Sequence, residues 1–341
     1  MSSITLIASS ELPDPLQPQP GPLWSVALHP SNTELCCVGS SPITGHQVNL
    51  YSFPSLDPLP LPPLDISKRT LRCCLYSPLS SLTSTLLVVG SFSGSIYLLQ
   101  SSPSSPPSLL QTLEGQESEI KSLSYTPTAD ILASSSRDKT VWLWDTETYE
   151  PLSILTGHTG DVKCCKFLSN TKIFSAGYDG LFKVWEEDED GDWSMVQSLE
   201  VVTGNEGDGQ ETLWCVEGVG SGWRVFLGTG GGETVALKEE GGKYEVCGRI
   251  EGKGEECYSV CLPSVRAGHG GVLRSEGRGF GVYRERSGFG VEGGGVMFRK
   301  DAGVEEAHSA EVNCVKWCRE GEKIVSVGDD GRVRVWKYDI G

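Results

Sequence analysis

One short strand signature returns seven times along this 341-residue chain, and this repetition constrains the fold more than any other feature. Each copy alternates apolar and polar residues, as a half-buried strand does. The seven copies begin at Trp24, Arg72, Lys121, Lys163, Trp214, Tyr258 and Asn313. A repeat of about 40 to 50 residues built from strands and tight turns predicts an all-β propeller with one four-stranded blade per repeat.

Three copies carry a set of polar and aromatic residues at constant spacing, in which an Asp lies six residues and a Ser ten residues before a Trp. The sets are His158, Ser175, Asp179 and Trp185; His308, Ser326, Asp330 and Trp336; and Gln116, Ser134, Asp138 and Trp144. These spacings are typical of the WD40 repeat. We expect each set to form a buried chain of hydrogen bonds, so we assign these residues a structural role rather than a general-base role.

The other four repeats are degenerate and carry other residues at the Trp position, namely Tyr51, Leu99, Lys238 and Tyr283. The regular spacing of the whole series predicts a single domain of seven blades. The expected blades span residues 22–54, 68–102, 113–148, 155–198, 199–246, 250–290 and 305–341. Too few residues follow Trp336 for a fourth strand, whereas Ile4 to Ala8 form an apolar segment without a blade. Residues 3–9 are therefore expected to complete the last blade and close the ring.

The formal net charge of −17 argues against general binding to nucleic acid or to anionic membranes, because both require a strongly basic face. Protein partners are favoured instead. The N-terminal segment lacks a basic stretch before an apolar one, and no apolar run is long enough to span a membrane. The sequence therefore predicts a soluble protein of the cytosol, with the nucleus as a further location.

Twelve cysteines raise the question of metal binding. Pairs such as Cys164 and Cys165 are adjacent within strands, so their side chains point to opposite faces and cannot ligate one ion together. We interpret the cysteines as small buried residues of a reducing compartment, with no metal and no cofactor. A cluster-binding or redox protein is the alternative. No nucleophile lies at usable spacing from a base, and the glycine clusters near Gly218 and Gly228 do not join a strand to a helix, so neither an enzyme nor a nucleotide site is predicted.

Three segments are expected to connect or flank the blades. Glu11 to Pro22 and Ser101 to Ser108 are rich in proline and should form extended connectors. Glu186 to Trp193 is a run of acidic residues after the third strand of blade four. Such runs are typical of solvated turns, and a docking site for a basic partner is the alternative.

In each inner strand, the residue after the first apolar position is expected to face the narrow opening of the ring. These are Trp24, Arg72, Lys121, Lys163, Trp214, Tyr258 and Asn313, to which the turns before the tetrad Asp add Arg137, Tyr178 and Asp329. Aromatic residues and arginine at a preorganised rim are typical of interaction hot spots. Because the basic members lie on blades two to four, the sequence predicts an acidic or carboxylate-ended protein segment as the ligand.

Two parts of the chain resemble the WD40 protein of cytosolic iron-sulfur assembly: Leu113 to Trp193, which includes SSSRDKTVWLWD and AGYDGLFKVW, and Ala307 to Tyr338, which includes DDGRVRVWKY. The resemblance implies a non-enzymatic scaffold of the late-acting targeting complex. Such a scaffold holds a HEAT-repeat adaptor and a small partner with a reactive cysteine, and helps to deliver [4Fe-4S] clusters to cytosolic and nuclear apoproteins. Arg137 matches a functional arginine of that family within SRDK.

A substrate receptor of a ubiquitin ligase is the alternative among interaction scaffolds. Such receptors often carry Trp-Asp-x-Arg after the third strand of a blade. Here Trp144 and Asp145 are followed by Thr146 and Glu147, which argues against that assignment.

Overall fold

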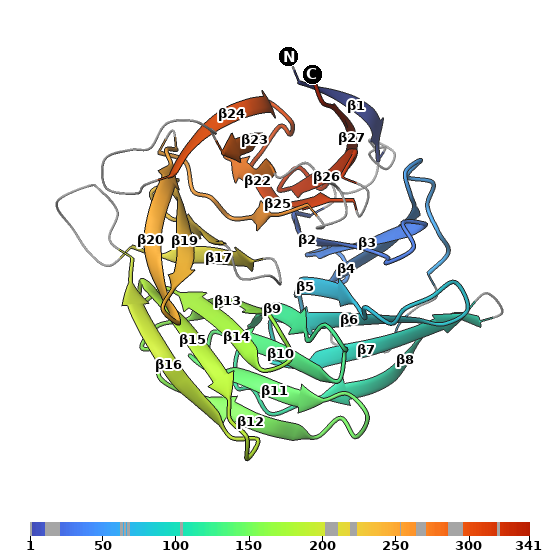
Figure 1. Cartoon of the computed structure of the whole chain (residues 1–341). Helices are drawn as coiled ribbons and strands as arrows, with labels where there is room; N and C mark the ends of the chain where they lie inside the picture. The colour runs from blue at the N-terminus through green and yellow to red at the C-terminus, as the bar shows by residue number, and fades with distance from the viewer. Residues whose placement is uncertain are drawn as a thin grey trace.

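The computed structural model of the chain describes residues 2–10, 21–61, 64, 66, 69–102, 105–201, 211–218, 224–252, 254–263, 271–285, 296–318 and 321–341. All regular elements in these residues are β-strands, and none of these residues forms a helix suited to crossing a membrane. The strands make seven blades around a central opening, as Figure 1 shows. The predicted all-β propeller of seven blades is confirmed.

The strands follow one another from the inner to the outer edge of each blade. Blades one to three contain β2 (Leu23–Leu28), β3 (Glu34–Gly39) and β4 (Gln47–Ser52); β5 (Leu71–Tyr76), β6 (Thr85–Ser91), β7 (Ile96–Ser102) and β8 (Ser105–Leu113); and β9 (Ile120–Tyr125), β10 (Ile131–Ser136), β11 (Val141–Asp145) and β12 (Pro151–Leu155). Blades four and five contain β13 (Val162–Phe167), β14 (Lys172–Gly177), β15 (Leu181–Glu187) and β16 (Trp193–Glu200); and β17 (Leu213–Gly218), β18 (Val225–Thr229), β19 (Thr234–Glu240) and β20 (Lys243–Ile250). Blades six and seven contain β21 (Val260–Cys261), β22 (Gly271–Glu276), β23 (Gly279–Glu285) and β24 (Val296–Val304); and β25 (Val312–Trp317), β26 (Lys323–Gly328), β27 (Val333–Asp339) and β1 (Ser3–Ser9).

The N-terminal strand closes the ring, as the sequence predicts. β1 runs antiparallel to β27 as the outer strand of blade seven, with Ile4 opposite Tyr338. The two ends of the chain therefore lie side by side at this blade (Figure 1). This pairing covers the edge of β27, which would otherwise offer unpaired backbone groups to another chain.

The fourth strands differ most from the sequence-based expectation. Ser101 to Ser108 do not connect two blades: β8, which begins at Ser105, pairs with β7 as the outer strand of blade two. The outer strands of blades two to six all end beyond the expected limits of those blades. Most residues of β8 are exposed, so this strand lacks the apolar alternation that marks a half-buried strand. Residues 11–20 and 219–223, parts of the expected connector and of a glycine cluster, lie outside the described residues.

The core is divided among the blade interfaces rather than collected at one centre. Between blades two and three, Leu98, Ile120, Leu132 and Trp144 pack together, and none of them is more than 2% exposed. Each blade is therefore stabilised mainly by its two neighbours, which is how a chain of this length can fold as one ring. Blades five and six are joined further by a short parallel pairing of β20 with β24.

Candidate functional site: the central opening

The polar set of blade four forms a continuous chain of hydrogen bonds. His158 Nδ1 lies 2.8 Å from Asp179 Oδ2, and His158 Nε2 lies 2.7 Å from Ser175 Oγ. Trp185 Nε1 donates to the same Ser175 Oγ at 2.9 Å. All four residues are buried. These hydrogen bonds connect the loop before β13 to the second and third strands of the blade.

Blade seven repeats this arrangement with His308, Asp330, Ser326 and Trp336. His308 Nδ1 lies 2.8 Å from Asp330 Oδ1, and its Nε2 lies 2.8 Å from Ser326 Oγ. Trp336 Nε1 donates to Ser326 Oγ at 2.9 Å. Burial lowers the pKa of His308 below its usual range, although the carboxylate of Asp330 acts in the opposite direction. A neutral imidazole suits this position because it can donate to the carboxylate and accept from the serine.

Blade three uses an amide where the other two blades use an imidazole. Ser134 Oγ donates to Gln116 Oε1 at 2.6 Å and accepts from Trp144 Nε1 at 2.9 Å. Asp138 accepts instead from the backbone N–H of Glu117, at 3.0 Å. Glutamine therefore keeps the serine and tryptophan satisfied without a titratable group.

A β-bulge recurs at the top of the inner strands. The pairing register with the second strand skips one residue between Leu23 and Ser25, and it skips the corresponding residue in blades two to five and in blade seven. The skipped residues are Trp24, Arg72, Lys121, Lys163, Trp214 and Asn313. A bulged residue leaves the ladder and can aim its side chain elsewhere, here at the opening of the ring.

These six residues and Tyr258, which we call the rim residues, line one cavity of about 760 Å³ along the axis of the propeller. Asp329 lines it as well. Arg137 lies outside this cavity and lines a neighbouring pocket of about 540 Å³ together with Arg69 and Phe92. Tyr178 joins the rim through its ring, which lies 5.7 Å from that of Trp214. The sequence-predicted partner residues therefore surround one mouth of the ring.

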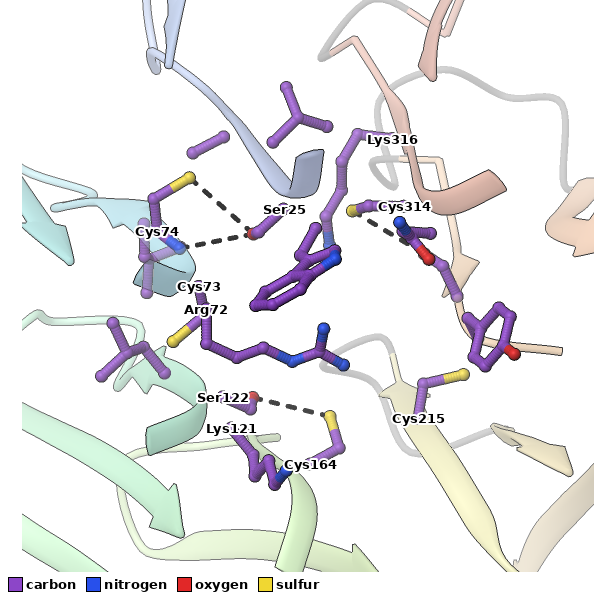
Figure 2. A pocket seen from close by; sticks show the side chains of 18 of the residues that line it. Ser25, Arg72, Cys73, Cys74, Lys121, Ser122, Cys164, Cys215, Cys314 and Lys316 are labelled. Atoms are coloured by element: carbon purple, nitrogen blue, oxygen red, sulfur yellow. Dashed lines mark hydrogen bonds between the residues drawn. The ribbon is translucent and has the colours of Figure 1, made fainter. Parts of the chain in front are cut away.

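Next to the rim residues along the inner strands, a second ring of serines and cysteines lines the same cavity, and Figure 2 shows several of its members. Its members are Ser25, Cys73, Ser122, Cys164, Cys215, Ser259 and Cys314. The serines join neighbouring blades: Ser25 Oγ accepts from the backbone N–H of Cys74 at 3.3 Å, and Ser259 Oγ accepts from that of Val315 at 3.2 Å. This ring therefore stabilises the arrangement of the blades.

Three cations of the rim, Arg72, Lys121 and Lys163, form a cluster in which one carboxylate, that of Glu119, pairs with the first two. Glu119 Oε2 lies 2.5 Å from Lys121 Nζ, and Glu119 Oε1 lies 3.6 Å from Arg72 Nε. Asp161 lies 3.9 Å from Arg137 Nε, and the Arg137 side chain remains 64% exposed. This side of the rim therefore has a surplus of positive charge in a protein of net charge −17.

Aromatic rings flank the cation cluster on both sides. The ring of Trp24 lies 5.0 Å from that of Phe92, and the Arg72 guanidinium lies 5.0 Å from the centroid of Trp24. On the other side, the ring of Trp214 lies 4.9 Å from that of Tyr258. Rigid aromatic faces beside cations offer both contact area and charge-assisted hydrogen bonds to an acidic segment.

The opposite side of the rim is acidic and already hydrogen-bonded. Tyr258 donates to Glu256 and is also 3.1 Å from Glu311. Asn313 Nδ2 donates to Asp329 Oδ1 at 2.6 Å and to the carbonyl of Leu23 at 2.9 Å. The predicted partner residues therefore separate into a basic side on blades two to four and a polar, acidic side on blades six and seven.

The twelve cysteines are free, and all are buried except Cys164, which is half-buried. Burial raises the pKa of thiols such as Cys73 and Cys165. Cys215 Sγ donates to the carbonyl of Cys257 at 3.8 Å, a contact between blades five and six that the strand-face argument missed. Within the part of the chain that the structure describes, no three cysteine, histidine or acidic side chains are grouped to hold a metal ion.

Sequence reasoning missed two members of the site. Glu119 stands just before an inner strand, and Phe92 follows the second strand of blade two, so neither position belongs to the repeating signature. The nearness of Glu119 to Lys121 in the sequence is a signal that could have suggested the first. No comparable signal exists for Phe92, because its partner Trp24 belongs to another blade.

The comparisons with known proteins agree with this architecture. The WD40 repeat (WD domain, G-beta repeat) matches residues 107–145, 149–186 and 300–337. The solved WD40 beta-propeller domain of Doa1 superposes with a TM-score of 0.71 over 98% of this chain and 97% of that chain, at 18% sequence identity. The chain therefore has the WD40 β-propeller fold.

The WD40 propeller is also similar to several curated proteins, each named probable cytosolic iron-sulfur protein assembly protein 1. The protein of Chaetomium globosum is 30% identical, and the match covers 67% of this chain and 65% of that protein's length. The protein of Candida albicans is 26% identical, and the match covers 92% of this chain and 96% of that protein. The protein of Kluyveromyces lactis is 27% identical, and the match covers 93% of this chain and 94% of that protein. These relatives carry the same name as the family that the sequence resembles.

Proposed function

We propose that this propeller is a non-catalytic scaffold of the cytosolic iron-sulfur protein assembly machinery. The similarity to proteins named for that process supports the assignment. The observation that carries the binding mode is the cation cluster of Arg72, Lys121 and Lys163, in which one carboxylate pairs with the first two and which lies between aromatic rings. An acidic or carboxylate-ended segment of a protein partner binds at this side of the rim.

The partners are a HEAT-repeat adaptor, a small assembly protein with a reactive cysteine, and iron-sulfur apoproteins of the cytosol and the nucleus. In this role the propeller holds partners together while [4Fe-4S] clusters, the cargo, pass to the apoproteins. No residue of the propeller reacts chemically. Most of the buried thiols have raised pKa values, as Cys73 does, which supports a role outside the transfer chemistry because the thiolate is the metal ligand. The pKa of Cys257 is instead lowered by its hydrogen bond with Cys215, but its side chain is fully buried.

The test is affinity purification from extracts of the source organism with tagged wild-type protein and an Arg72→Ala/Lys121→Ala variant. Recovery of a HEAT-repeat protein and iron-sulfur enzymes with the wild type, and their loss with the variant, supports the proposal. Lys243 is the exposed first residue of β20, the outer strand of blade five, so Lys243→Ala is the matched control. Recovery of ubiquitin-ligase subunits in place of assembly proteins contradicts the proposal.

A further inference from the structure

Lys163 occupies a position that differs from those of the other cations of the rim. Its Nζ lies 3.9 Å from the ring centroid of Tyr178 and 4.1 Å from that of Trp214. Tyr178 belongs to the turn between β14 and β15 of the same blade, whereas Trp214 stands on the inner strand of blade five. The residue is only 7% exposed, although it lines the central cavity. Two rings therefore hold the amine in a fixed place at the mouth of the ring.

The charges around Lys163 leave it without a counter-ion of its own. Among the described residues Lys163 forms no ion pair. Of the two nearby carboxylates, Glu119 pairs with Lys121 and Arg72, and Asp161 pairs with Arg137. Lys121 on β9 and Arg72 on β5 face the amine as like charges. The carboxylates of Asp161 and Glu119 attract the Lys163 amine only from beyond 4.0 Å. Tyr178 contacts the amine with the face of its ring. A carboxylate supplied from outside would therefore meet an unpaired cation.

We propose that Lys163 is the anchor for the acidic group of the partner and takes up a proton when that group binds. This inference rests on the proposed function, since it assigns one residue of the same site the main role in recognition. Tyr178 and Trp214 act as positioning residues, because they hold the amine where the incoming carboxylate must pass.

The proton uptake follows from what burial does to the free amine. Burial lowers the pKa of Lys163 to about 7, and the charges of Lys121 and Arg72 act in the same direction, whereas the faces of the two rings favour the ammonium form. A bound carboxylate favours the ammonium form further and raises this pKa. Below pH 7 the amine is charged before binding, and above pH 7 binding must first protonate it. Affinity is therefore highest at low pH and falls as the pH rises.

Isothermal titration with a hexaglutamate peptide in 150 mM salt tests the inference. The peptide is acetylated at its N-terminus, so that its α-amino group does not titrate, and its carboxyl groups do not titrate between pH 6.5 and 8.5. N-acetylated hexaglutamine, which lacks the side-chain charges, is the control. With the wild type, we expect the dissociation constant to rise about 20-fold across this range. At pH 8 we expect binding to take up about one proton, which is measured from the difference in binding enthalpy between phosphate and Tris buffers. Lys163→Arg keeps its charge at every pH, so its affinity for the peptide should change by less than about twofold between pH 6.5 and 8.5. Lys163→Met should bind weakly throughout, and Lys243→Met should behave as the wild type.

A second measurement reports on Lys163 without any ligand. Trace acylation at a series of pH values, read by mass spectrometry, gives the pH at which the Lys163 amine becomes reactive, and we expect a value near 7 that rises when hexaglutamate is added. Equal affinity at pH 6.5 and 8.5, or reactivity only near pH 10, overturns the proton uptake while leaving the proposed rim site standing. Hexaglutamate binding no better than hexaglutamine at every pH overturns both. If Lys163→Met binds with full affinity, only the assignment of Lys163 as the anchor is overturned, and the rim site stands.

Discussion

Leu6 of the N-terminal strand lies opposite Trp336 of the last strand, so the two ends of the chain complete the same blade. Trp336 also donates to Ser326 within the hydrogen-bonded set of that blade. The N-terminal strand thus pairs directly with the strand that supplies this indole.

Deletion of residues 2–10 should therefore destabilise the propeller. The deletion exposes the edge of β27 and removes the packing of Ile4 against blade seven. A loss of about 1 to 2 kcal/mol would lower the melting temperature by roughly 2 to 4 °C and favour self-association. Thermal melts and size-exclusion chromatography provide the measurement. A monomeric deletion protein with an unchanged melting temperature would contradict the structural role of β1.

Replacing His308 by Gln should remove part of the pH dependence of stability. Burial lowers the pKa of His308 in the fold, so its contribution to stability is present above the unfolded value of about 6.5 and is lost as the pH falls towards the folded value. Glutamine serves the same position in blade three, where Gln116 accepts from Ser134. Urea unfolding between pH 7.5 and 5.5 should show a steeper loss of stability for the wild type than for His308→Gln. Parallel pH profiles would refute this prediction.

Ser175→Ala should cost more stability than an ordinary serine substitution. The change leaves both Trp185 Nε1 and His158 Nε2 without their buried partner. Two unsatisfied buried groups predict a loss of about 2 to 4 kcal/mol in the free energy of unfolding. Ser194 is exposed on the outer strand of the same blade, so Ser194→Ala is the control and should change stability by less than about 0.5 kcal/mol. Equal effects of the two substitutions would argue against a cooperative network.

Arg137→Glu should separate binding from folding. Its side chain is 64% exposed and lies 3.9 Å from Asp161, so the substitution should change the free energy of unfolding by only about 0.5 kcal/mol. Loss of a charge-assisted contact and repulsion of an acidic partner should weaken binding by roughly 2 to 5 kcal/mol if the contact is desolvated. Pull-down and thermal melts of the two proteins, side by side, measure both effects. Retained binding would make Arg137 a solvated surface residue, and an unfolded variant would place it in the blade network.

Protein purified without oxygen should contain far less than one iron per chain and should lack charge-transfer absorbance near 400 nm. The thiols are buried, and the cysteines of the described residues form no ligand group. Iron and sulfide analysis with a visible spectrum provide the measurement, and a chelator should leave the melting temperature unchanged. Stoichiometric iron that disappears in Cys164→Ser or Cys314→Ser would reassign the ring of serines and cysteines as a cluster site.

Much of the fold was predictable because its signals are local. The spacing of His158, Ser175, Asp179 and Trp185 reflects one blade, in which the loop before the inner strand meets the next hairpin, and the bonds among them follow from that geometry. The outer strands were not predictable to the same degree. β8 faces solvent along most of its length and depends on pairing with β7 rather than on its own pattern.

The sequence by itself determined the repeat, the number of blades and where the inner strands lie, since period-2 alternation and turn spacing act within a few residues along the chain. Only the tertiary structure decided how those residues are used. The bulges aim Arg72 and Lys163 at the axis, Glu119 neutralises part of the cluster across two blades, and Tyr178 and Trp214 of adjacent blades enclose one lysine. These relationships depend on how the blades are oriented when Leu6 pairs with Trp336 and closes the ring, and no local pattern encodes that orientation.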